Sequence, residues 1–181
     1  YLIGILWLKS QISFMPRMNE EKFWRMIYGL FFGANAGGKL LFVALEWRAY
    51  WNGELHFLSD FRYGFVFFGG LLGAIAMGLL VARWCDITYL GAADYFGVAL
   101  PMGHWLGRLG CLGAGCCYGR PTTLPWGVTL GGLPLHPTQV YESVADIAIF
   151  LFLLTRMLPL VKKGKLPPGT VFLSYILLYS A

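Results

Sequence analysis

Charged residues are scarce in this sequence. Of its 181 residues, 13% are charged and 57% are hydrophobic, and the mean hydropathy is +0.61. A soluble domain of this length needs more polar surface than that, so the composition excludes one and indicates a membrane protein. Lipid cannot satisfy open backbone groups, which favours helical spans of about 20 residues. We therefore expect an all-α polytopic membrane protein.

The sequence also lacks an initial Met, a visible signal peptide and any internal repeat. Apolar segments predict one transmembrane domain over residues 1–181, a bundle of helices with a large outer-side loop that carries the site. Full spans are expected near residues 26–45, 65–82, 87–106 and 141–161, and partial spans at 1–9 and 169–181, where both ends look cut.

A basic stripe interleaved with exposed aromatic residues is missing too, which argues against nucleic-acid binding. The net charge of +5 instead follows the loops. We number the loops between the expected spans in chain order. The positive-inside rule then makes the first, third and fifth loops cytoplasmic and places the fourth, residues 108–139, on the outer side. Those three loops hold nine of the fourteen basic residues: Lys9, Arg17, Lys22, Arg25, Arg83, Arg156, Lys162, Lys163 and Lys165.

The stretch GRLGCLGAGCCYGRP, residues 107–121, places Arg108 and Arg120 among glycines. A guanidinium is always charged and forms paired bonds with phosphate oxygens. Glycines such as Gly119 allow the backbone to approach a headgroup closely. This pattern indicates a site for an anionic phospholipid headgroup, and simple interfacial anchoring is the alternative.

The same stretch holds Cys111, Cys116 and Cys117. On an oxidising outer side, a Cys111–Cys116 disulfide that rigidifies the loop is the preferred interpretation. Together with His136 the three thiols also make four possible zinc ligands, although C-x4-C-C is not a familiar metal spacing. A thiolate beside Arg108 or Arg120, or plain small-residue packing, stays open. We expect no bound metal and no cofactor.

Polar residues inside membrane spans are costly and are functional candidates by default. Lys39 either reaches the membrane surface or is buried, and Asp94 either pairs with a cation of a neighbouring helix or has a functional role. The glycine pairs 37–38 and 69–70 indicate close helix packing, or else room for a headgroup. The other polar residues within the spans are Asn35, His104, Glu142 and Asp146.

The stretch LHPTQVYE begins a helix in which His136, Gln139, Tyr141 and Glu142 cluster. Helix capping alone explains the Pro and Thr of this stretch, but not the other four together. Glu142 and Asp146, four residues apart, share a helical face.

The order of these motifs resembles the prolipoprotein diacylglyceryl transferases, bacterial inner-membrane enzymes of lipoprotein maturation. The resemblance covers nearly the whole chain. It is carried by residues 26–45, 67–73 and 93–110, by the Tyr-Gly-Arg at 118–120, and by HPTQVYE at 136–142, which is close to the family's His-Pro-Ser-Gln-Leu-Tyr-Glu.

Several positions depart from the family pattern. Lys39 replaces an arginine, and Phe68 stands where the family has a histidine. In the signature, Cys111 and Ala114 replace two asparagines, and Cys116 replaces a glutamate.

The resemblance implies transfer of a diacylglyceryl group from phosphatidylglycerol to the thiol of a lipoprotein cysteine, with release of glycerol phosphate. The partners it implies are phosphatidylglycerol, a prolipoprotein peptide and the lipid bilayer. Fixed positive charge must stabilise the leaving phosphate, and a base must take the thiol proton. We expect His136, or alternatively His104, to be this base, and Glu142 and Tyr141 to orient it. Catalytic roles are expected for His136, Arg108 and Glu142, and substrate binding by Arg108, Arg120, Gly119, Gln139, Tyr141 and His104.

Two alternatives stay open at this point. One is a divergent, non-catalytic lipid-binding relative on the same fold. The other is a membrane thiol or metal protein that uses Cys111, Cys116, Cys117 and His136.

Overall fold

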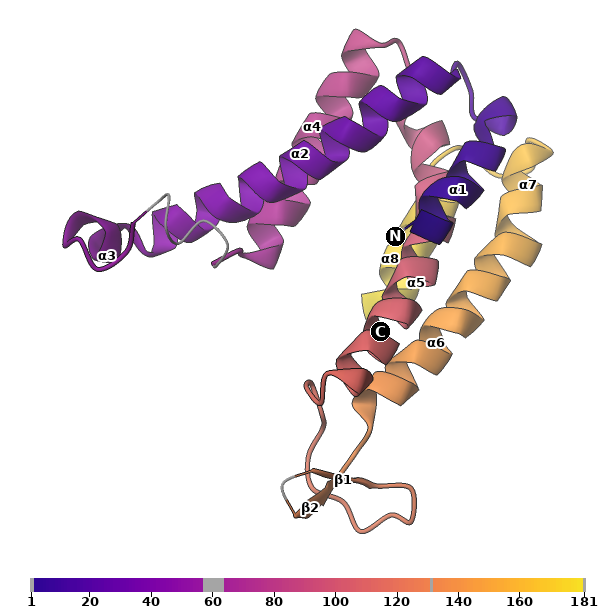
Figure 1. Cartoon of the computed structure of the whole chain (residues 1–181). Coiled ribbons are helices and arrows are strands. Elements are labelled where there is room, and N and C mark those ends of the chain that lie inside the picture. The colour runs from indigo at the N-terminus through magenta and orange to yellow at the C-terminus, as the bar shows by residue number, and fades with distance from the viewer. Residues whose placement is uncertain (1, 57–63, 131, 181) are drawn as a thin grey trace. The chain divides into compact units, whose positions relative to one another are not determined.

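The computed structural model describes residues 2–56, 64–130 and 132–180 (Figure 1). Helices dominate these residues, which confirms the all-α prediction; the short strands β1 (Val128–Leu130) and β2 (Leu133–Leu135) pair as an antiparallel hairpin. The helices are α1 (Leu2–Ser10), α2 (Glu20–Leu45), α3 (Trp47–Trp51), α4 (Phe67–Trp84), α5 (Tyr89–Gly113), α6 (Thr138–Phe152), α7 (Leu158–Lys162) and α8 (Thr170–Ser180), with a 3-10 turn η1 at Ile12–Phe14 and a π-helical segment η2 at Leu153–Met157.

Helices occupy all four stretches expected to span the membrane. Three are long and apolar enough to cross a bilayer: Glu20–Leu45, Phe67–Trp84 and the continuous helix Thr138–Lys162. The fourth, α5, extends past the predicted end of its span to Gly113, so Arg108 lies on a helix rather than in the loop that we expected to begin there. The span limits and the single transmembrane domain stay predictions.

The chain forms two compact units, of which residues 16–89 make one. Its helix α2 begins at Asn19, whose side chain accepts a hydrogen bond from the Lys22 backbone N–H at 2.8 Å and so caps the helix. Two acidic residues in the first turn complement the helix dipole.

Helices α2 and α4 pack through glycines. A Cβ atom added at Gly33 would overlap the carbonyl oxygen of Gly73, and one added at Gly37 would overlap that of Gly69. This confirms close helix packing at Gly37 and Gly69, because only hydrogen side chains leave room for the two backbones.

Lys39, on α2, is buried within this unit at 4% exposure. Its Nζ lies 5.3 Å from the ring centroid of Phe42 and 5.6 Å from that of Phe65. A cation over aromatic faces is stabilised by the ring quadrupoles. Of the two interpretations of Lys39, the structure therefore supports the buried one. Phe68, the second residue of α4, is by contrast 67% exposed.

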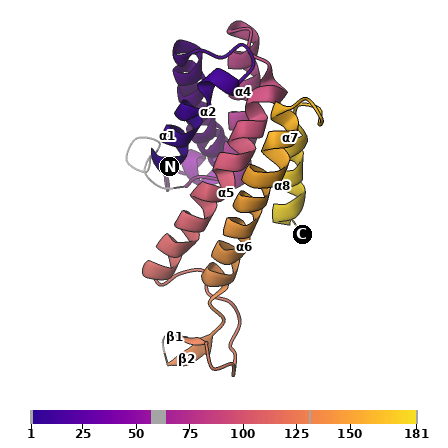
Figure 2. The ribbon, with the colours of Figure 1, turned by 90° about the vertical axis from the view of Figure 1, so that its right-hand side faces the viewer.

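The other unit comprises residues 1–15 and 90–181. Its helices α5, α6 and α8 run side by side, and the hairpin lies beyond the C-terminal end of α5 and the N-terminal end of α6 (Figure 2). The Ser143 hydroxyl donates to the Trp105 carbonyl at 3.2 Å and joins α6 to α5.

Asp94, on α5, is fully buried and caps α8. Its Oδ1 accepts hydrogen bonds from the backbone N–H groups of Val171 at 2.8 Å and Phe172 at 3.1 Å, and its Oδ2 accepts one from Gly169 at 2.7 Å. These donors lack partners within the helix, so a carboxylate satisfies them well. The expectation of a cationic partner for Asp94 was wrong, because backbone donors take that place.

Candidate active site

Arg108 and Glu142 form an ion pair between α5 and α6. The Arg108 Nη2 lies 2.5 Å from the Glu142 Oε2, and the two side chains are 30% and 42% exposed. Tyr179, on α8, lies close enough to act electrostatically on Arg108. The ion pair with Glu142 therefore holds the guanidinium in place while part of it stays accessible.

His104 lies one turn before Arg108 on α5, on the same face. Its Nδ1 is 2.7 Å from the Tyr175 hydroxyl, and its ring centroid is 5.0 Å from that of Tyr179. The two tyrosines, one turn apart on α8, thus join His104 to the surroundings of Arg108.

Asp146 follows Glu142 by one turn on α6 and is 1% exposed. Its Oδ2 has no hydrogen-bond partner among the described residues. Arg108 and Glu142 are the charged groups that act on it most strongly. The two acidic residues therefore share one face of α6, as their spacing predicts, and Glu142 pairs with the Arg108 guanidinium.

His136 stands immediately before α6, next to Tyr141. Its Nδ1 lies 3.2 Å from the Tyr141 hydroxyl, which also accepts a 2.8 Å hydrogen bond from the Trp126 indole N–H. The imidazole is thereby held by one nitrogen, and no hydrogen bond to the other, Nε2, comes from the residues that the structure describes.

Gly119 and Arg120 run alongside His136. The Gly119 N–H donates to the His136 carbonyl at 2.9 Å, and the His136 N–H donates to the Arg120 carbonyl at 3.0 Å. A Cβ atom at Gly119 would lie 2.7 Å from the Thr138 side chain, so this close approach requires glycine. The Arg120 side chain is exposed.

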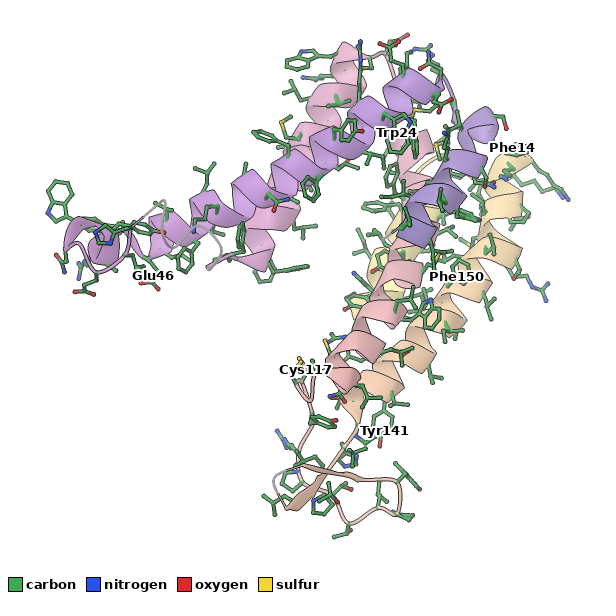
Figure 3. All side chains as sticks on the ribbon, in the orientation of Figure 1. Phe14, Trp24, Glu46, Cys117, Tyr141 and Phe150 are labelled. Carbon is green, nitrogen blue, oxygen red and sulfur yellow. The ribbon has the colours of Figure 1, made fainter. Side chains whose placement is uncertain are left out.

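The loop between α5 and the hairpin is tied to the start of α6. The Thr138 hydroxyl donates to the Cys117 carbonyl at 2.7 Å, and the buried Gln139 amide donates to the Cys116 carbonyl. The Gln139 Oε1 is also buried and has no partner among the described residues. Figure 3 shows Cys117 close to the end of α5 and Tyr141 on the first turn of α6.

Cys111, Cys116 and Cys117 are free thiols in the structure, so the Cys111–Cys116 disulfide predicted from the sequence is not formed. Their sulfur atoms all lie within 4.8 Å of one another. Hydrogen bonding with Cys117, reinforced by the nearby Cys111, raises the pKa of the Cys116 thiol to about 11. At neutral pH this thiol is protonated and is therefore a poor nucleophile.

The structure thus brings the predicted residues together in two neighbouring groups at the start of α6. Arg108 and Glu142 pair directly, with His104 joined to them through the tyrosines of α8, while His136 meets Tyr141 beside Gly119 and Arg120. Among the described residues, Glu142 pairs with Arg108 rather than with His136, the histidine that we expected it to orient. Sequence reasoning missed Tyr175, Tyr179 and Trp126, for which the only signal is the four-residue spacing of the tyrosines.

The fold and this site together define a polytopic membrane protein in which an arginine side chain is held in place near the end of a helix bundle. Comparison with known proteins identifies the group: a family model described as prolipoprotein diacylglyceryl transferase matches residues 1–181. The chain belongs to this family, as the sequence motifs predicted.

Several bacterial relatives carry the name phosphatidylglycerol–prolipoprotein diacylglyceryl transferase. The transferase 2 of Clostridium perfringens is 31% identical over 99% of this chain and 73% of its own length. The Geobacter sulfurreducens protein is 37% identical over 85% of this chain and 59% of its own length. That of Clostridioides difficile is 34% identical over 78% of this chain and 55% of its own length. The chain thus spans between about half and three quarters of these relatives.

Proposed function

We propose that the protein transfers a diacylglyceryl group from phosphatidylglycerol to the thiol of a lipoprotein cysteine. The names of its relatives support this reaction. In this reaction, the substrate sulfur attacks the carbon of the diacylated glycerol that bears the phosphate. The C–S bond forms as the C–O bond breaks, and the electron pair leaves with glycerol phosphate.

The observation that carries the proposal is the position of Arg108. A phosphate that leaves with negative charge needs a preorganised cation, and fixed donors act more strongly in a site that is partly shielded from water. Arg108 is held by its ion pair with Glu142 and is 30% exposed, so it meets both conditions. Its remaining N–H groups face a lipid headgroup in this scheme, and the exposed Arg120 adds a second charge.

His136 is the proposed base. In this scheme Nδ1 carries the imidazole proton and donates it in a hydrogen bond to the Tyr141 hydroxyl oxygen, so the unprotonated Nε2 can accept the proton of the substrate thiol. Gly119 bonds to the backbone of His136, and Gln139 anchors the neighbouring loop at the Cys116 carbonyl. His104, bonded to Tyr175 of α8, stabilises the side of the site where the headgroup would bind. Glu142 acts on Arg108 rather than on the base.

The proposed setting is the bacterial plasma membrane, with the site on its outer side. In the unit that holds the site, α5 and the continuous helix from α6 to α7 run in opposite directions. Lys162, Lys163 and Lys165 therefore lie at the end opposite to Arg108 and Glu142. The positive-inside rule assigns that lysine end to the cytoplasm. The phosphatidylglycerol and the lipoprotein peptide then meet the site from the outer leaflet.

The test uses the full protein in membranes. Phosphatidylglycerol labelled in its diacylglyceryl part is supplied with a peptide that carries a lipoprotein cysteine, or with the same peptide carrying serine. Label on the cysteine peptide alone is the expected result. Absence of label from both peptides, while the lipid still binds, overturns the proposal in favour of a lipid-binding relative.

A further inference from the structure

The three clustered cysteines owe their arrangement to the way α5 ends. The Cys116 N–H bonds to the Cys111 carbonyl at 3.1 Å, and the Gly115 N–H bonds to the Leu112 carbonyl at 3.2 Å. Gly115 has a φ of +67°. These two bonds with a left-handed glycine form a Schellman cap, in which the first and last residues place their side chains against each other. Here those two residues are Cys111 and Cys116.

Cys117 completes the cluster through an unusual backbone conformation. Its φ is +63°, a left-handed value that is strained for a residue with a Cβ atom. The Cys117 Sγ lies 3.5 Å from the Cys116 Sγ. The turn therefore folds the third thiol back onto the second.

The sulfur positions match what a metal requires. In a site with metal–sulfur bonds of about 2.3 Å, the sulfur atoms stand about 3.8–4.0 Å apart. One pair here is 3.5 Å apart, and no pair exceeds 4.8 Å. Shifts of less than about 1 Å, within the rotamer freedom of exposed thiols, bring all three into the bonding arrangement. A disulfide would use only two of the three sulfurs.

Thiolate ligands select soft cations, above all zinc and monovalent copper. Three thiolates provide a complete trigonal set for monovalent copper, and a tetrahedral zinc ion would take one water in addition. Thr138 and Gln139 at the start of α6 hold the carbonyls of Cys117 and Cys116, so the thiol loop is already anchored on one side.

We propose that Cys111, Cys116 and Cys117 form a binding site for a thiophilic cation, zinc or monovalent copper, which fixes the end of α5 to the loop that leads to His136. The cation has a structural role there and takes no part in group transfer. This inference stands beside the proposed function and does not rest on it.

The test is metal binding by the full protein in detergent, purified under reducing conditions. Zinc, monovalent copper and, as a spectroscopic probe, cadmium are added separately, and bound metal per chain is measured by mass spectrometry. Replacement of any one thiol, as in Cys111→Ser, Cys116→Ser or Cys117→Ser, should weaken binding by more than about 100-fold, because even outer-shell changes cost about 10- to 100-fold. The matched control is Cys85→Ser, which alters the fourth free thiol and should leave binding unchanged.

X-ray absorption of the cadmium-loaded wild-type protein tests the site without any variant, so its result does not depend on whether a variant folds. The expected first shell holds three sulfur atoms. A first shell of nitrogen and oxygen, equal binding in all four serine variants, or no binding by the reduced wild-type protein would each overturn the site. None of these results involves lipid or peptide, so a failure to bind metal would refute this site and leave the proposed function standing.

Discussion

At the residue scale, the ion pair between Arg108 of α5 and Glu142 of α6, 2.5 Å apart, joins two helices at the candidate site. The sequence predicts that both residues belong to the site, with Glu142 orienting His136, but it does not predict that they meet. Periodicity shows which residues share a helix face. It does not show which residue of another helix each one meets, and α5 and α6 are joined by a loop and a hairpin.

We expect Glu142→Gln to lower kcat/KM for transfer by about tenfold. A hydrogen bond to a charged group contributes about 1.5–3 kcal/mol, and the partial exposure of this pair places the effect at the low end. In steady-state transfer assays, the double variant Arg108→Ala/Glu142→Gln should be no slower than Arg108→Ala alone. Losses that multiply in the double variant would show that Glu142 acts independently of Arg108.

The Cys116 thiol gives a prediction about pH in the metal-free protein. Because its pKa is raised to about 11, its thiolate fraction is small at neutral pH and rises until that value is passed. Alkylation by iodoacetamide, followed by peptide mass spectrometry, should speed up about tenfold per pH unit between pH 8 and 10. In Cys117→Ser the rate should level off at a lower pH. A rate in the wild-type protein that is already flat above pH 9 would contradict the contact between these thiols.

At the element scale, the helices themselves could be predicted from apolar length, and their ends could not. Helix α5 contains Pro101 and passes beyond the predicted limit of its span to Gly113. The left-handed Gly115 then ends it in a Schellman cap. That cap explains the C-x4-C spacing, which corresponds to no familiar metal motif. The signal for the cap in the sequence was a glycine followed by a cysteine.

Asp94 makes a prediction about α8. Asp94→Ala leaves three backbone N–H groups at the start of that helix without an acceptor and should lower the free energy of unfolding by about 3 kcal/mol. Asp94→Asn keeps one acceptor oxygen and should lose less than Asp94→Ala. Thermal unfolding in detergent measures both values. Equal stability of Asp94→Ala and the wild-type protein would mean that α8 is not held by this carboxylate.

At the scale of the whole molecule, the composition predicted a polytopic membrane protein, and the motifs predicted its family. The tyrosines of α8 beside His104 could not be foreseen, because Tyr175 and Tyr179 lie about seventy residues further along the chain in an apolar segment. Contacts at such sequence separation come from tertiary packing.

The proposed orientation can be read from thiol accessibility in intact cells. In a protein without its four native cysteines, Thr123→Cys in the outer loop should react with a membrane-impermeant maleimide, and Lys165→Cys at the opposite end should react only after cell lysis. Both positions are exposed to solvent, which makes them a matched pair. The reverse pattern would contradict the proposed orientation and show that the site faces the cytoplasm.

The most direct test of the central claim is diacylglyceryl transfer by Arg108→Ala, measured in membranes with labelled phosphatidylglycerol and a cysteine peptide. The matched control is Arg156→Ala, an exposed arginine about 20 Å from Glu142 along the same continuous helix. We predict that transfer falls by at least about 100-fold in Arg108→Ala, the cost of removing one preorganised donor, and stays at the wild-type rate in Arg156→Ala. Full transfer by Arg108→Ala would contradict the assignment of this arginine to the leaving phosphate.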